Sequence, residues 1–317
     1  MIGIVLAAGL GTRLRPYTAA VSKAAMPVAG VAIAVRVIEQ LRAAGGADRV
    51  IVIAQSPEHD VVPLIEEHAR RHGYEVAFGY QRRPRGSAHA LMHVPDREGL
   101  DEDVLIGACD NLYEPDELGR LVAQHGASGA DGTMAVLRAA SEGMGASSNV
   151  VVEGERVVRV IEKPALEAVA SPFAGPLLYA FSPKVLACLD AVGESARGEF
   201  EFQDAIQAFI AGGARVGWFE FSRRATLTTP EDLLALNEKV FGGLPGGTRT
   251  EGDVTFVGPV VVDAGVEIGP GSTVGPNAHL MRGCRVGRGA TVRHALVFPG
   301  AVVADGAGVE HALVAPA

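Results

Sequence analysis

The stretch Leu6-Ala-Ala-Gly9-Leu-Gly11-Thr-Arg13-Leu-Arg-Pro-Tyr-Thr18, here called the signature loop, follows directly on a short apolar run at residues 2–7. The run predicts a buried first strand, and the two glycines allow backbone N–H groups to approach a phosphate without obstruction by a Cβ atom. The stretch is not the dinucleotide fingerprint, since Leu14 replaces the third glycine. It is not a Walker loop either, since no Gly-Lys-Ser/Thr follows. It therefore predicts a phosphate-binding loop of another kind.

A second basic position follows ten residues after Arg13, in the segment Ser22-Lys23-Ala-Ala-Met-Pro27. Arg13 and Lys23 together could neutralise a departing pyrophosphate, and the planar guanidinium can bind a phosphate through two hydrogen bonds. A lone lysine is ordinary surface charge, so this prediction depends on the pair.

Beyond the loop, apolar runs alternate with helical stretches over residues 1–243. Strands are predicted at 2–7, 49–54 and 104–108, and helices at 32–44 and 58–72, the second introduced by Ser56-Pro57. The alternation predicts an α/β fold with a mostly parallel, Rossmann-like sheet. The strand at 104–108 would deliver Asp110 to the carboxyl end of the sheet, where ligands bind in open parallel sheets.

After a Gly/Pro-rich linker at 242–250, one apolar position recurs every six residues. These positions are Phe256, Val262, Ile268, Val274, Leu280, Val286, Val292 and Phe298. A six-residue period fits neither a helix nor an ordinary strand and is typical of hexapeptide solenoids. The period fades at Ala304 and Glu310, as a terminal cap should. We therefore predict a second domain over residues 251–317.

Composition narrows the possible functions. A net charge of -9 argues against a nucleic-acid surface, because phosphate backbones select positive faces, but it leaves room for small phosphorylated substrates. Cys109, Cys188 and Cys284 are far apart without metal-binding spacing, which predicts reduced thiols and a cytoplasmic protein. No apolar run approaches the length of a membrane span, and the first residues lack the pattern of a cleaved signal.

The signature loop, followed by Ser22-Lys-Ala-Ala-Met-Pro-Val-Ala-Gly30, closely resembles the signature of sugar nucleotidyltransferases, which include glucose-1-phosphate thymidylyltransferases and UTP- or GTP-using relatives. The resemblance extends along nearly the whole chain. It implies the nucleotide-diphospho-sugar transferase fold and, after it, a left-handed parallel β-helix in which three hexads form one triangular turn. It also implies transfer of a nucleotidyl group from a nucleoside triphosphate, dTTP or UTP favoured, to a sugar-1-phosphate with release of pyrophosphate.

The same resemblance implies the nucleotide site. Residues 80–91 look like the base-reading segment of the family, with Gln81 on the base edge and Gly86 admitting the base closely. The nucleotide-binding residues implied are Leu6, Ala8, Gly9, Gly11, Thr12, Gln81, Gly86 and Ser87. Asp110, in Ile-Gly-Ala-Cys-Asp110-Asn111, looks like the strand-end aspartate that binds catalytic Mg²⁺.

The sugar side is implied by Glu162-Lys163-Pro164, which matches a family segment whose glutamate contacts sugar hydroxyls and whose lysine grips the sugar phosphate. Asn111 and Gly175 complete the implied sugar site. The expected catalytic residues are then Arg13, Lys23, Asp110 and Lys163. Each segment alone has a plainer explanation, for example a solvated loop at Gln81 or a turn at Asp110-Asn111.

Three other interpretations stay open. The chain could be a nucleotide-sugar-binding relative that has lost turnover. It could be an acyltransferase, although the predicted solenoid is short, lacks a long histidine-bearing loop, and has His279, His294 and His311 at positions expected on the surface. The solenoid could also serve assembly alone, which we favour for that domain, so a homo-oligomer is expected.

Two segments depart from the family pattern. Where the family has a second metal-binding aspartate, alignment on Thr229-Pro230-Glu231-Asp232 places Thr226, a neutral hydroxyl that is a poorer ligand for Mg²⁺. Asp204 or Glu201 could substitute for it. Where the family has Tyr-Gly before the Glu-Lys-Pro strand, this chain has Gly143-Met-Gly-Ala-Ser-Ser-Asn149, so an unusual sugar or cyclitol phosphate is possible.

Overall fold

The computed structural model describes residues 1–139 and 147–316, so Gly143 to Ala146 of the departing segment lie outside the described residues. The chain divides by compactness into two units. The first comprises Met1–Gly9 and Ala34–Ala225, and the second comprises Leu10–Ile33 and Thr226–Ala317. The division therefore falls within the signature loop, whereas the domains predicted from the sequence divide the chain between residues 243 and 251. Within the described residues, no helix combines the length and apolarity needed to cross a bilayer.

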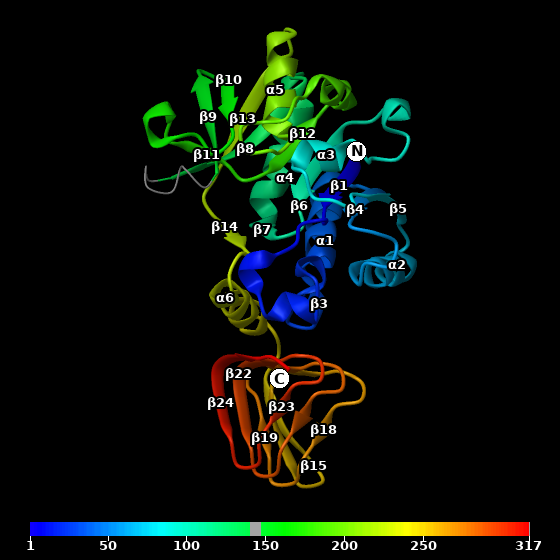
Figure 1. The fold of residues 1–317 in the computed structure, drawn as a ribbon, viewed down its shortest axis with the longest axis vertical. Coiled ribbons are helices and arrows are strands. Elements are labelled where there is room, and N and C mark those ends of the chain that lie inside the picture. The colour runs from blue at the N-terminus through cyan, green and yellow to red at the C-terminus, as the bar shows by residue number, and fades with distance from the viewer. Residues whose placement is uncertain (140–146, 317) are drawn as a thin grey trace. The chain divides into compact units, whose positions relative to one another are not determined.

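The first unit is built on one mixed sheet with strand order β10-β9-β11-β8-β12-β6-β1-β4-β5, and β13 pairs with β8 (Figure 1). Its strands are β1 Ile2–Leu6, β4 Arg49–Ala54, β5 Glu75–Tyr80, β6 Val104–Ala108, β8 Gly132–Arg138, β9 Ser148–Glu153, β10 Arg156–Ile161, β11 Phe173–Gly175, β12 Leu178–Phe181 and β13 Val216–Phe221. The short strands β7 Asn111–Tyr113 and β14 Arg224–Thr226 form a separate pair. The predicted strands at 49–54 and 104–108 are confirmed, and the first strand ends one residue earlier than predicted.

The parallel part of the sheet is its centre and one side. β1 pairs in parallel with β4 and with β6, and β4 pairs in parallel with β5. From β12 onward, the pairs β12–β6, β12–β8, β11–β8, β11–β9 and β10–β9 are antiparallel. On that flank only β13 pairs in parallel, with β8. The sheet is thus parallel where the signature loop leaves β1, and mainly antiparallel on the flank that carries the Glu-Lys-Pro segment.

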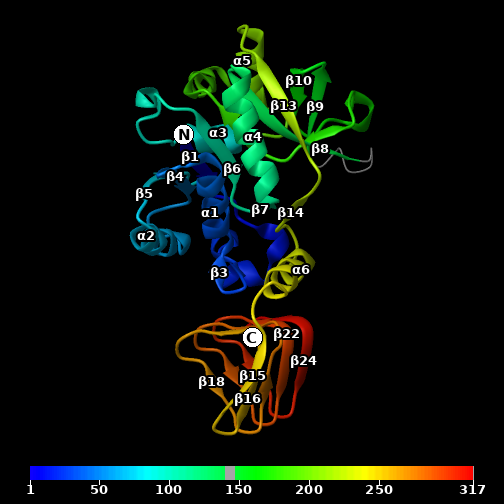
Figure 2. The ribbon, with the colours of Figure 1, turned by 180° about the vertical axis from the view of Figure 1, so that it is seen from behind.

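Helices cover both faces of this sheet. Along β1 and β6, Ile2, Ile4 and Ile106 pack into one apolar core with α3 and α5. A Cβ atom on the next residue, Gly107, would face Leu41 of α1, and because successive side chains in a strand point to opposite faces, α1 lies on the other side. Figure 2, seen from behind, shows α1 and α4 in front of the sheet. The helices are α1 Ile33–Gly45, α2 Val61–His72, α3 Ser87–Leu91, α4 Pro115–Ser128 and α5 Phe202–Ala211, with a 3-10 helix at Pro183–Ala191.

One predicted helix start is wrong. The predicted helix at 58–72 begins at Val61, because the segment introduced by Ser56 first forms a turn in which the Ser56 carbonyl accepts the N–H of His59. The signal at Ser56-Pro57 therefore belongs to a turn ahead of the helix.

The second unit contains most of the signature loop, helix α6 Pro230–Phe241 and the C-terminal strands. The loop forms 3-10 turns at Thr12–Leu14, Tyr17–Ala19 and Lys23–Ala25, followed by the hairpin β2 Pro27–Val28 and β3 Val31–Ala32. Helix α6 begins sharply because Pro230 occupies its first turn and Thr229 and Asp232 form a reciprocal capping box. Asn237 of α6 holds the hairpin, accepting the N–H of Ala29 at 2.7 Å.

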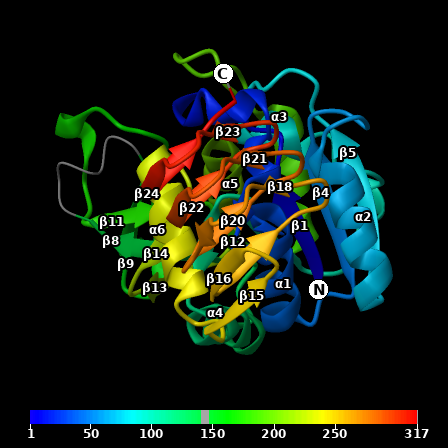
Figure 3. The same ribbon diagram turned by 90° about the horizontal axis from the view of Figure 1, so that it is seen from below.

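The C-terminal strands stack in parallel ladders. They are β15 Gly247–Glu251, β16 Val254–Gly258, β17 Val260–Val262, β18 Glu267–Ile268, β19 Thr273–Val274, β20 Ala278–Leu280, β21 Arg285–Val286, β22 Thr291–Val297, β23 Val302–Val303 and β24 Gly308–Val314. Because β15 begins at Gly247, the predicted linker at 242–250 ends in a strand. Figure 3 shows β18, β21 and β23 side by side, as their pairing requires.

The ladders confirm most of the six-residue pattern and correct its end. Phe256 pairs with Val274 and Val274 with Val292, each three hexads further on, but Leu280 pairs with Val297, one residue short of three hexads. One residue is thus missing from the period before Phe298, which was predicted to occupy the repeat position. The pattern does not fade at 304 and 310. Its positions are shifted by one residue toward the N-terminus, so that Val303 pairs with Val286 and Val309 pairs with Val292.

Two side chains of this region differ from expectation. Val262, one of the repeating apolar positions and therefore expected to be buried, is 40% exposed on β17. His279, predicted on the surface, is 2% exposed, and its Nε2 atom lies 3.0 Å from Asp263 Oδ1. Burial is possible for this histidine because the carboxylate satisfies one of its ring nitrogens.

Candidate active site

The carboxyl ends of the parallel strands gather several predicted residues of the first unit. Leu6 ends β1, and its carbonyl accepts the N–H of Cys109 at 3.1 Å, one residue before Asp110. Gln55, after β4, donates its amide to the Ala8 carbonyl at 3.3 Å. Gln81 follows β5, with its backbone N–H on the carbonyl of Ala54. The predicted residues Leu6, Ala8, Gln81 and Asp110 therefore share one sheet edge.

The predicted base-reading segment is tightly constrained. The amide nitrogen of Gln81, a residue 3% exposed, lies 3.0 Å from the Gly86 carbonyl and 2.9 Å from His89 Nδ1. Gly86 has a φ of 102°, and a Cβ atom there would lie 2.3 Å from the carbonyl oxygen of Phe200. Ser87 accepts the backbone N–H of Phe202 at 3.0 Å through its hydroxyl. The segment holds Gln81 in place and leaves no room for a larger residue at 86.

Asp110, the acidic residue that follows β6, lies near the polar side chains of Tyr113 and Arg224. Asn111, 4% exposed, donates its amide to the Pro176 carbonyl at 3.0 Å, and its Oδ1 is 3.4 Å from Arg224 Nη1. Burial, with the charge of Asp110 as a further cause, raises the pKa of the Tyr113 phenol, while Arg224 acts to lower it. Asp110, Tyr113 and Arg224 are thus close enough to act on one another electrostatically.

Of the predicted sugar-binding residues, Glu162 and Lys163 help to line a pocket of about 550 Å³, whereas Asn111 and Gly175 do not. Arg197, Glu201 and Asp204 also line this pocket. Lys163 Nζ is 3.7 Å from Glu162 Oε1. Arg197 donates to the Glu162 carbonyl at 3.2 Å and pairs with the buried carboxylate of Glu201. Burial raises the pKa of the Glu162 carboxyl, with Lys163 as the principal opposing influence.

Gly175, predicted to lie against the sugar, ends β11 beside Ser148. A Cβ atom on Gly175 would lie 2.5 Å from the Ser148 hydroxyl oxygen, and that hydroxyl donates to the Gly175 carbonyl at 3.2 Å. The close approach accounts for a glycine at this position.

Arg13 and Lys23 belong to the second unit, together with Gly11 and Thr12. The part of the signature loop that belongs to the first unit ends at Gly9. Gly11 has a φ of 61°, and a Cβ atom there would come 2.8 Å from Lys23 Cβ. Lys23 begins a short 3-10 turn that the Ser22 hydroxyl caps by accepting the N–H of Ala25 at 3.3 Å. The loop therefore brings Lys23 against Gly11, and Arg13 is exposed nearby in sequence.

The residues at the strand edge fit the Mg²⁺ that the family implies, with one protein carboxylate. Among the residues that the structure describes, no group of three protein ligands that includes Asp110 lies close enough to surround an ion. Mg²⁺ commonly takes one or two carboxylates and completes its shell with substrate phosphates and water. Asp110 would be the protein ligand of this kind. Glu201, considered above as a substitute ligand, is already paired with Arg197.

Sequence reasoning missed Arg224, Arg197 and His89. Arg224 stood in the stretch that departs from the family, and its pairing partner Asn111 is more than a hundred residues away. Arg197 also contacts a residue of another segment, Glu162, although these two residues are closer in the sequence than Arg224 and Asn111. A motif search finds neither contact, because each pairs residues from distant segments. His89 could have been found, since it lies in the quoted base-reading segment.

The α/β sheet carries a strand-end carboxylate, a constrained glycine turn and a pocket with basic side chains. This combination is typical of an enzyme that binds phosphorylated ligands. Residues 2–240 match the model of the family described as nucleotidyl transferase, and this chain belongs to that family. Residues 256–317 match the model described as the GMPPB C-terminal domain.

Similar proteins are sugar nucleotidyltransferases by name. The UTP–glucose-1-phosphate uridylyltransferase AglF of Haloferax volcanii is 30% identical over 73% of this chain and 93% of its own. A glucose-1-phosphate thymidylyltransferase of Streptomyces griseus is 28% identical over 94% of this chain and 81% of its own. A UDP-glucose pyrophosphorylase solved with UDP-glucose has the same fold, with a TM-score of 0.66 at 16% identity, over 77% of this chain and 99% of that one.

Proposed function

We propose that this chain transfers a nucleotidyl group from dTTP or UTP to a sugar-1-phosphate. An oxygen of the sugar phosphate forms a bond to the α-phosphorus as the bond to the β-phosphate breaks and pyrophosphate leaves. The observation that carries the proposal is the single sheet edge on which β1, β5 and β6 place Leu6, Gln81 and Asp110. The names of the uridylyl- and thymidylyltransferase relatives support it.

The base and ribose side is assigned to residues 80–91, where Gly86 lets the chain pass close to the backbone of Phe200. Gln81 offers its amide oxygen to a pyrimidine edge, because its amide nitrogen is held by the Gly86 carbonyl at 3.0 Å and by His89 Nδ1 at 2.9 Å. Leu6, Ala8, Gly9, Gly11, Thr12, Gly86 and Ser87 bind the nucleotide from the loop and the α3 turn. The choice of dTTP or UTP follows the Gly-Ser-Ala-His-Ala-Leu sequence of this segment.

The proposed reaction requires that the enzyme position the two substrates and neutralise their negative charge. Two anions that repel one another must be held in line, and the charge that develops on pyrophosphate must be neutralised. Arg13 and Lys23 stabilise the leaving group, and Lys163 holds the attacking phosphate. Removal of one such charge contact costs roughly 100-fold or more in rate.

The acceptor side uses the pocket around the Glu-Lys-Pro segment. Glu162 forms hydrogen bonds with sugar hydroxyls, and the nearby cation of Lys163, 3.7 Å away, offsets repulsion between its carboxylate and the incoming phosphate. Asn111 and Gly175 complete the surface toward the sugar. Asp110 would hold Mg²⁺, which would supply Lewis-acid neutralisation of the phosphate charge.

The test is pyrophosphate release measured with a matrix of nucleoside triphosphates and sugar or cyclitol phosphates. We expect the highest kcat/KM for dTTP or UTP with one hexose-1-phosphate. Highest activity with GTP or ATP would overturn the assignment of the base. Absence of release for every pair would overturn the activity itself.

A second candidate is a nucleotide-sugar-binding relative without turnover, and Thr226 is the observation that favours it. Thr226 offers a neutral hydroxyl, 3.3 Å from that of Thr228, where the family has an aspartate. We expect the enzyme to turn over with an increased Mg²⁺ requirement, and Thr226→Asp to lower that requirement, because Mg²⁺ favours anionic oxygen. Rate is measured against Mg²⁺ for both proteins, with Thr250→Asp, an exposed strand position, as the control. Equal Mg²⁺ dependence of the native chain, Thr226→Asp and Thr250→Asp would contradict the expectation that Thr226 raises the Mg²⁺ requirement.

We assign residues 1–243 to the catalytic domain and 251–317 to a left-handed β-helix of hexapeptide repeats that mediates homo-oligomer formation. The parallel ladders, spaced by three hexads or by one residue less, support three short sides per turn. The matches of residues 2–240 and 256–317 to separate family models support the boundary. Cys109, Cys188 and Cys284 are not joined in disulfides, which is compatible with a cytoplasmic location.

A further inference from the structure

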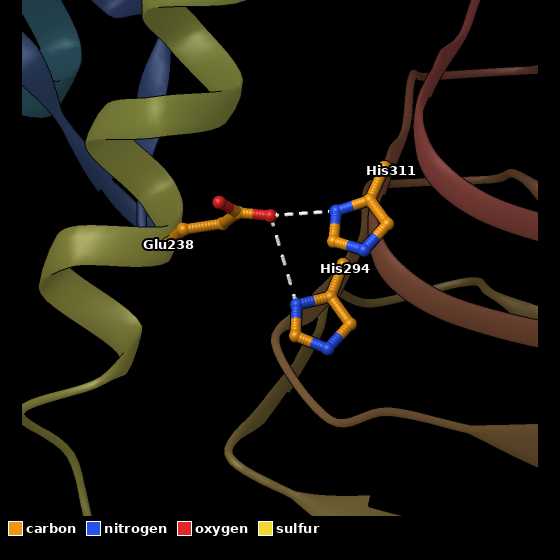
Figure 4. A group of neighbouring side chains, drawn as sticks. All are labelled: Glu238, His294 and His311. Atoms are coloured by element: carbon orange, nitrogen blue, oxygen red, sulfur yellow. Dashed lines mark hydrogen bonds and ion pairs between the residues drawn. The ribbon is translucent and has the colours of Figure 1, made fainter.

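A cluster of ionisable side chains in the second unit is not used by the proposed reaction. It consists of Glu238 on α6, His294 on β22 and His311 on β24, here called the histidine cluster. Glu238 Oε1 lies 2.8 Å from Nδ1 of His311 and 3.7 Å from Nδ1 of His294. Figure 4 shows both rings presenting Nδ1 to the same carboxylate oxygen.

The register shift in the ladders creates this arrangement. Because the period at this corner is one residue short of three hexads, Asn277, His294 and His311 occupy the same place in successive coils. All three have positive φ, of 55°, 48° and 47°. Asparagine suits this left-handed conformation, and histidine adopts it less readily than glycine would. Two successive histidines there are not needed to form the corner.

The corner positions stack the two imidazoles. Their ring centroids are 4.6 Å apart at an interplanar angle of 19°. Nδ1 of His294 is also 3.2 Å from Asn277 Nδ2. An amide N–H donated there requires an unprotonated Nδ1, which is the state in which imidazole can bind a metal.

We propose that the histidine cluster binds a borderline transition-metal ion of the Zn²⁺ type. Two imidazoles and one carboxylate are a common three-ligand set for Zn²⁺, and a water completes a tetrahedron. The three ligand atoms already lie within 4.8 Å of one another. Ligands about 2.1 Å from a tetrahedral ion are about 3.4 Å apart, so small rotations of the side chains close the site.

The ion would replace weak contacts with strong ones. It would replace the hydrogen bond between His311 and Glu238 and the amide contact of Asn277 to His294. Where Nδ1 of the neutral His311 ring carries the proton, that proton moves to Nε2. Because imidazole binds a metal ion only through an unprotonated nitrogen, the affinity for Zn²⁺ falls as pH decreases. The ion would tie α6 to β22 and β24. The nitrogen-rich ligand set of the cluster separates it from the Mg²⁺ site assigned to Asp110, because Mg²⁺ prefers oxygen ligands.

The test is a Zn²⁺ titration of the full chain, stripped with chelator, against a chromophoric competitor in millimolar Mg²⁺. We expect one Zn²⁺ per chain, with affinity lowered about 100-fold or more in His294→Asn and in His311→Asn. Asparagine is chosen because it tolerates positive φ at the equivalent Asn277. Glu238→Gln, on the helix, keeps the size of the side chain and should also weaken binding.

His72→Asn is the matched control. His72 stacks on His68 with centroids 4.1 Å apart, and His68 Nε2 is 3.1 Å from a carboxylate of Glu39, but within the described part of the chain these groups do not bring three ligands within reach of one ion. We expect this variant to bind Zn²⁺ like the native chain.

A second readout is the unfolding midpoint of the stripped proteins with and without Zn²⁺. Zn²⁺ should raise it in the native chain and in His72→Asn, and leave it unchanged in His294→Asn and His311→Asn, because ligand binding to the folded state stabilises it. Zn²⁺ affinity equal in native and cluster variants would overturn the site, as would displacement of Zn²⁺ by millimolar Mg²⁺. Neither outcome depends on nucleotidyl transfer.

Discussion

Two carboxyl groups of the candidate site lie in different surroundings. Asp110 follows β6 among Asn111, Tyr113 and Arg224, where its charge acts on a neighbouring phenol. Glu162 has a side chain only 16% exposed, and its neighbours include further carboxylates as well as Lys163. The same functional group can therefore serve as an anionic ligand in one place and as a hydrogen-bonding group in the other.

Asp110→Ala should reduce turnover at least about 100-fold without unfolding the chain, because Asp110 follows a strand and is not part of the apolar core. Turnover is measured as pyrophosphate release at saturating Mg²⁺. Asp101→Ala, at an exposed position before β6, is the control and should retain native activity. Full activity of purified Asp110→Ala would remove the metal assignment.

Glu162→Gln should change how stability depends on pH. Burial raises the pKa of this carboxyl above its ordinary value of 4.5, so the folded state holds the proton more tightly than the unfolded chain. Native stability therefore falls as pH rises through the interval between the ordinary and the raised pKa, and glutamine removes that loss. Compared with the native chain, the variant should gain stability between about pH 4 and about pH 8.

Urea midpoints at the two pH values measure this effect, with the exposed Glu155→Gln as control. The same substitution should raise KM for the sugar phosphate about 10-fold or more, because a group that bonds sugar hydroxyls is altered. Stability differences that do not change with pH would show that Glu162 is not destabilised by its burial.

At the scale of elements, local chemistry fixes where helices start more reliably than a residue pattern does. Thr229, Pro230 and Asp232 supply a capping box and a favourable first-turn proline, and α6 starts where they predict. Ser56-Pro57 carries a similar signal, yet a turn intervenes before Val61. The difference is that the Asp232 carboxylate accepts a hydrogen bond from the backbone N–H of Thr229, at 2.8 Å.

Thr229→Ala should lower the free energy of unfolding by about 1 kcal/mol, because the N–H of Asp232 loses its acceptor. The loss is measured by urea unfolding. Thr248→Ala, exposed on β15, is the control and should change stability by less than about 0.5 kcal/mol. An equal effect of the two substitutions would show that the cap does not stabilise α6.

At the scale of the whole molecule, the C-terminal coils are integrated into the second unit through the signature loop. The Tyr17 ring lies 4.9 Å from that of Phe298, and its hydroxyl donates to the Leu313 carbonyl at 3.3 Å. Phe298, which the six-residue count placed in the repeat, instead contacts the loop. The one-residue shift thus frees an aromatic side chain for this packing.

Truncation after Gly246 should reduce the number of chains per particle, because stacked coils present flat sides and apolar edges that associate symmetrically. Light scattering on a sizing column gives the mass, and circular dichroism with a cooperative urea transition shows whether the remaining chain is folded. The same number of chains before and after truncation of a folded protein would refute the assembly role of the coils.

The sequence by itself determined the elements and motifs whose signals are local. The strands at 49–54 and 104–108 were predictable to the residue because both are nearly continuous apolar runs. The first ends at the polar Gln55, and the second is followed by Asp110 after one further apolar residue. The strand-end position of Asp110 followed from the second of these. The six-residue period predicted the parallel pairing of Phe256 with Val274 and of Val274 with Val292, because equivalent positions three periods apart lie in register.

Only the tertiary structure decided what depends on register and on distant segments. A single missing residue after Val292 aligned His294 with His311 and moved Phe298 out of the repeat. Arg224 meets Asn111, and Arg197 meets Glu162, through packing of elements far apart in the chain. Such contacts are fixed by the sum of many weak packing interactions, and no short pattern of residues encodes that sum.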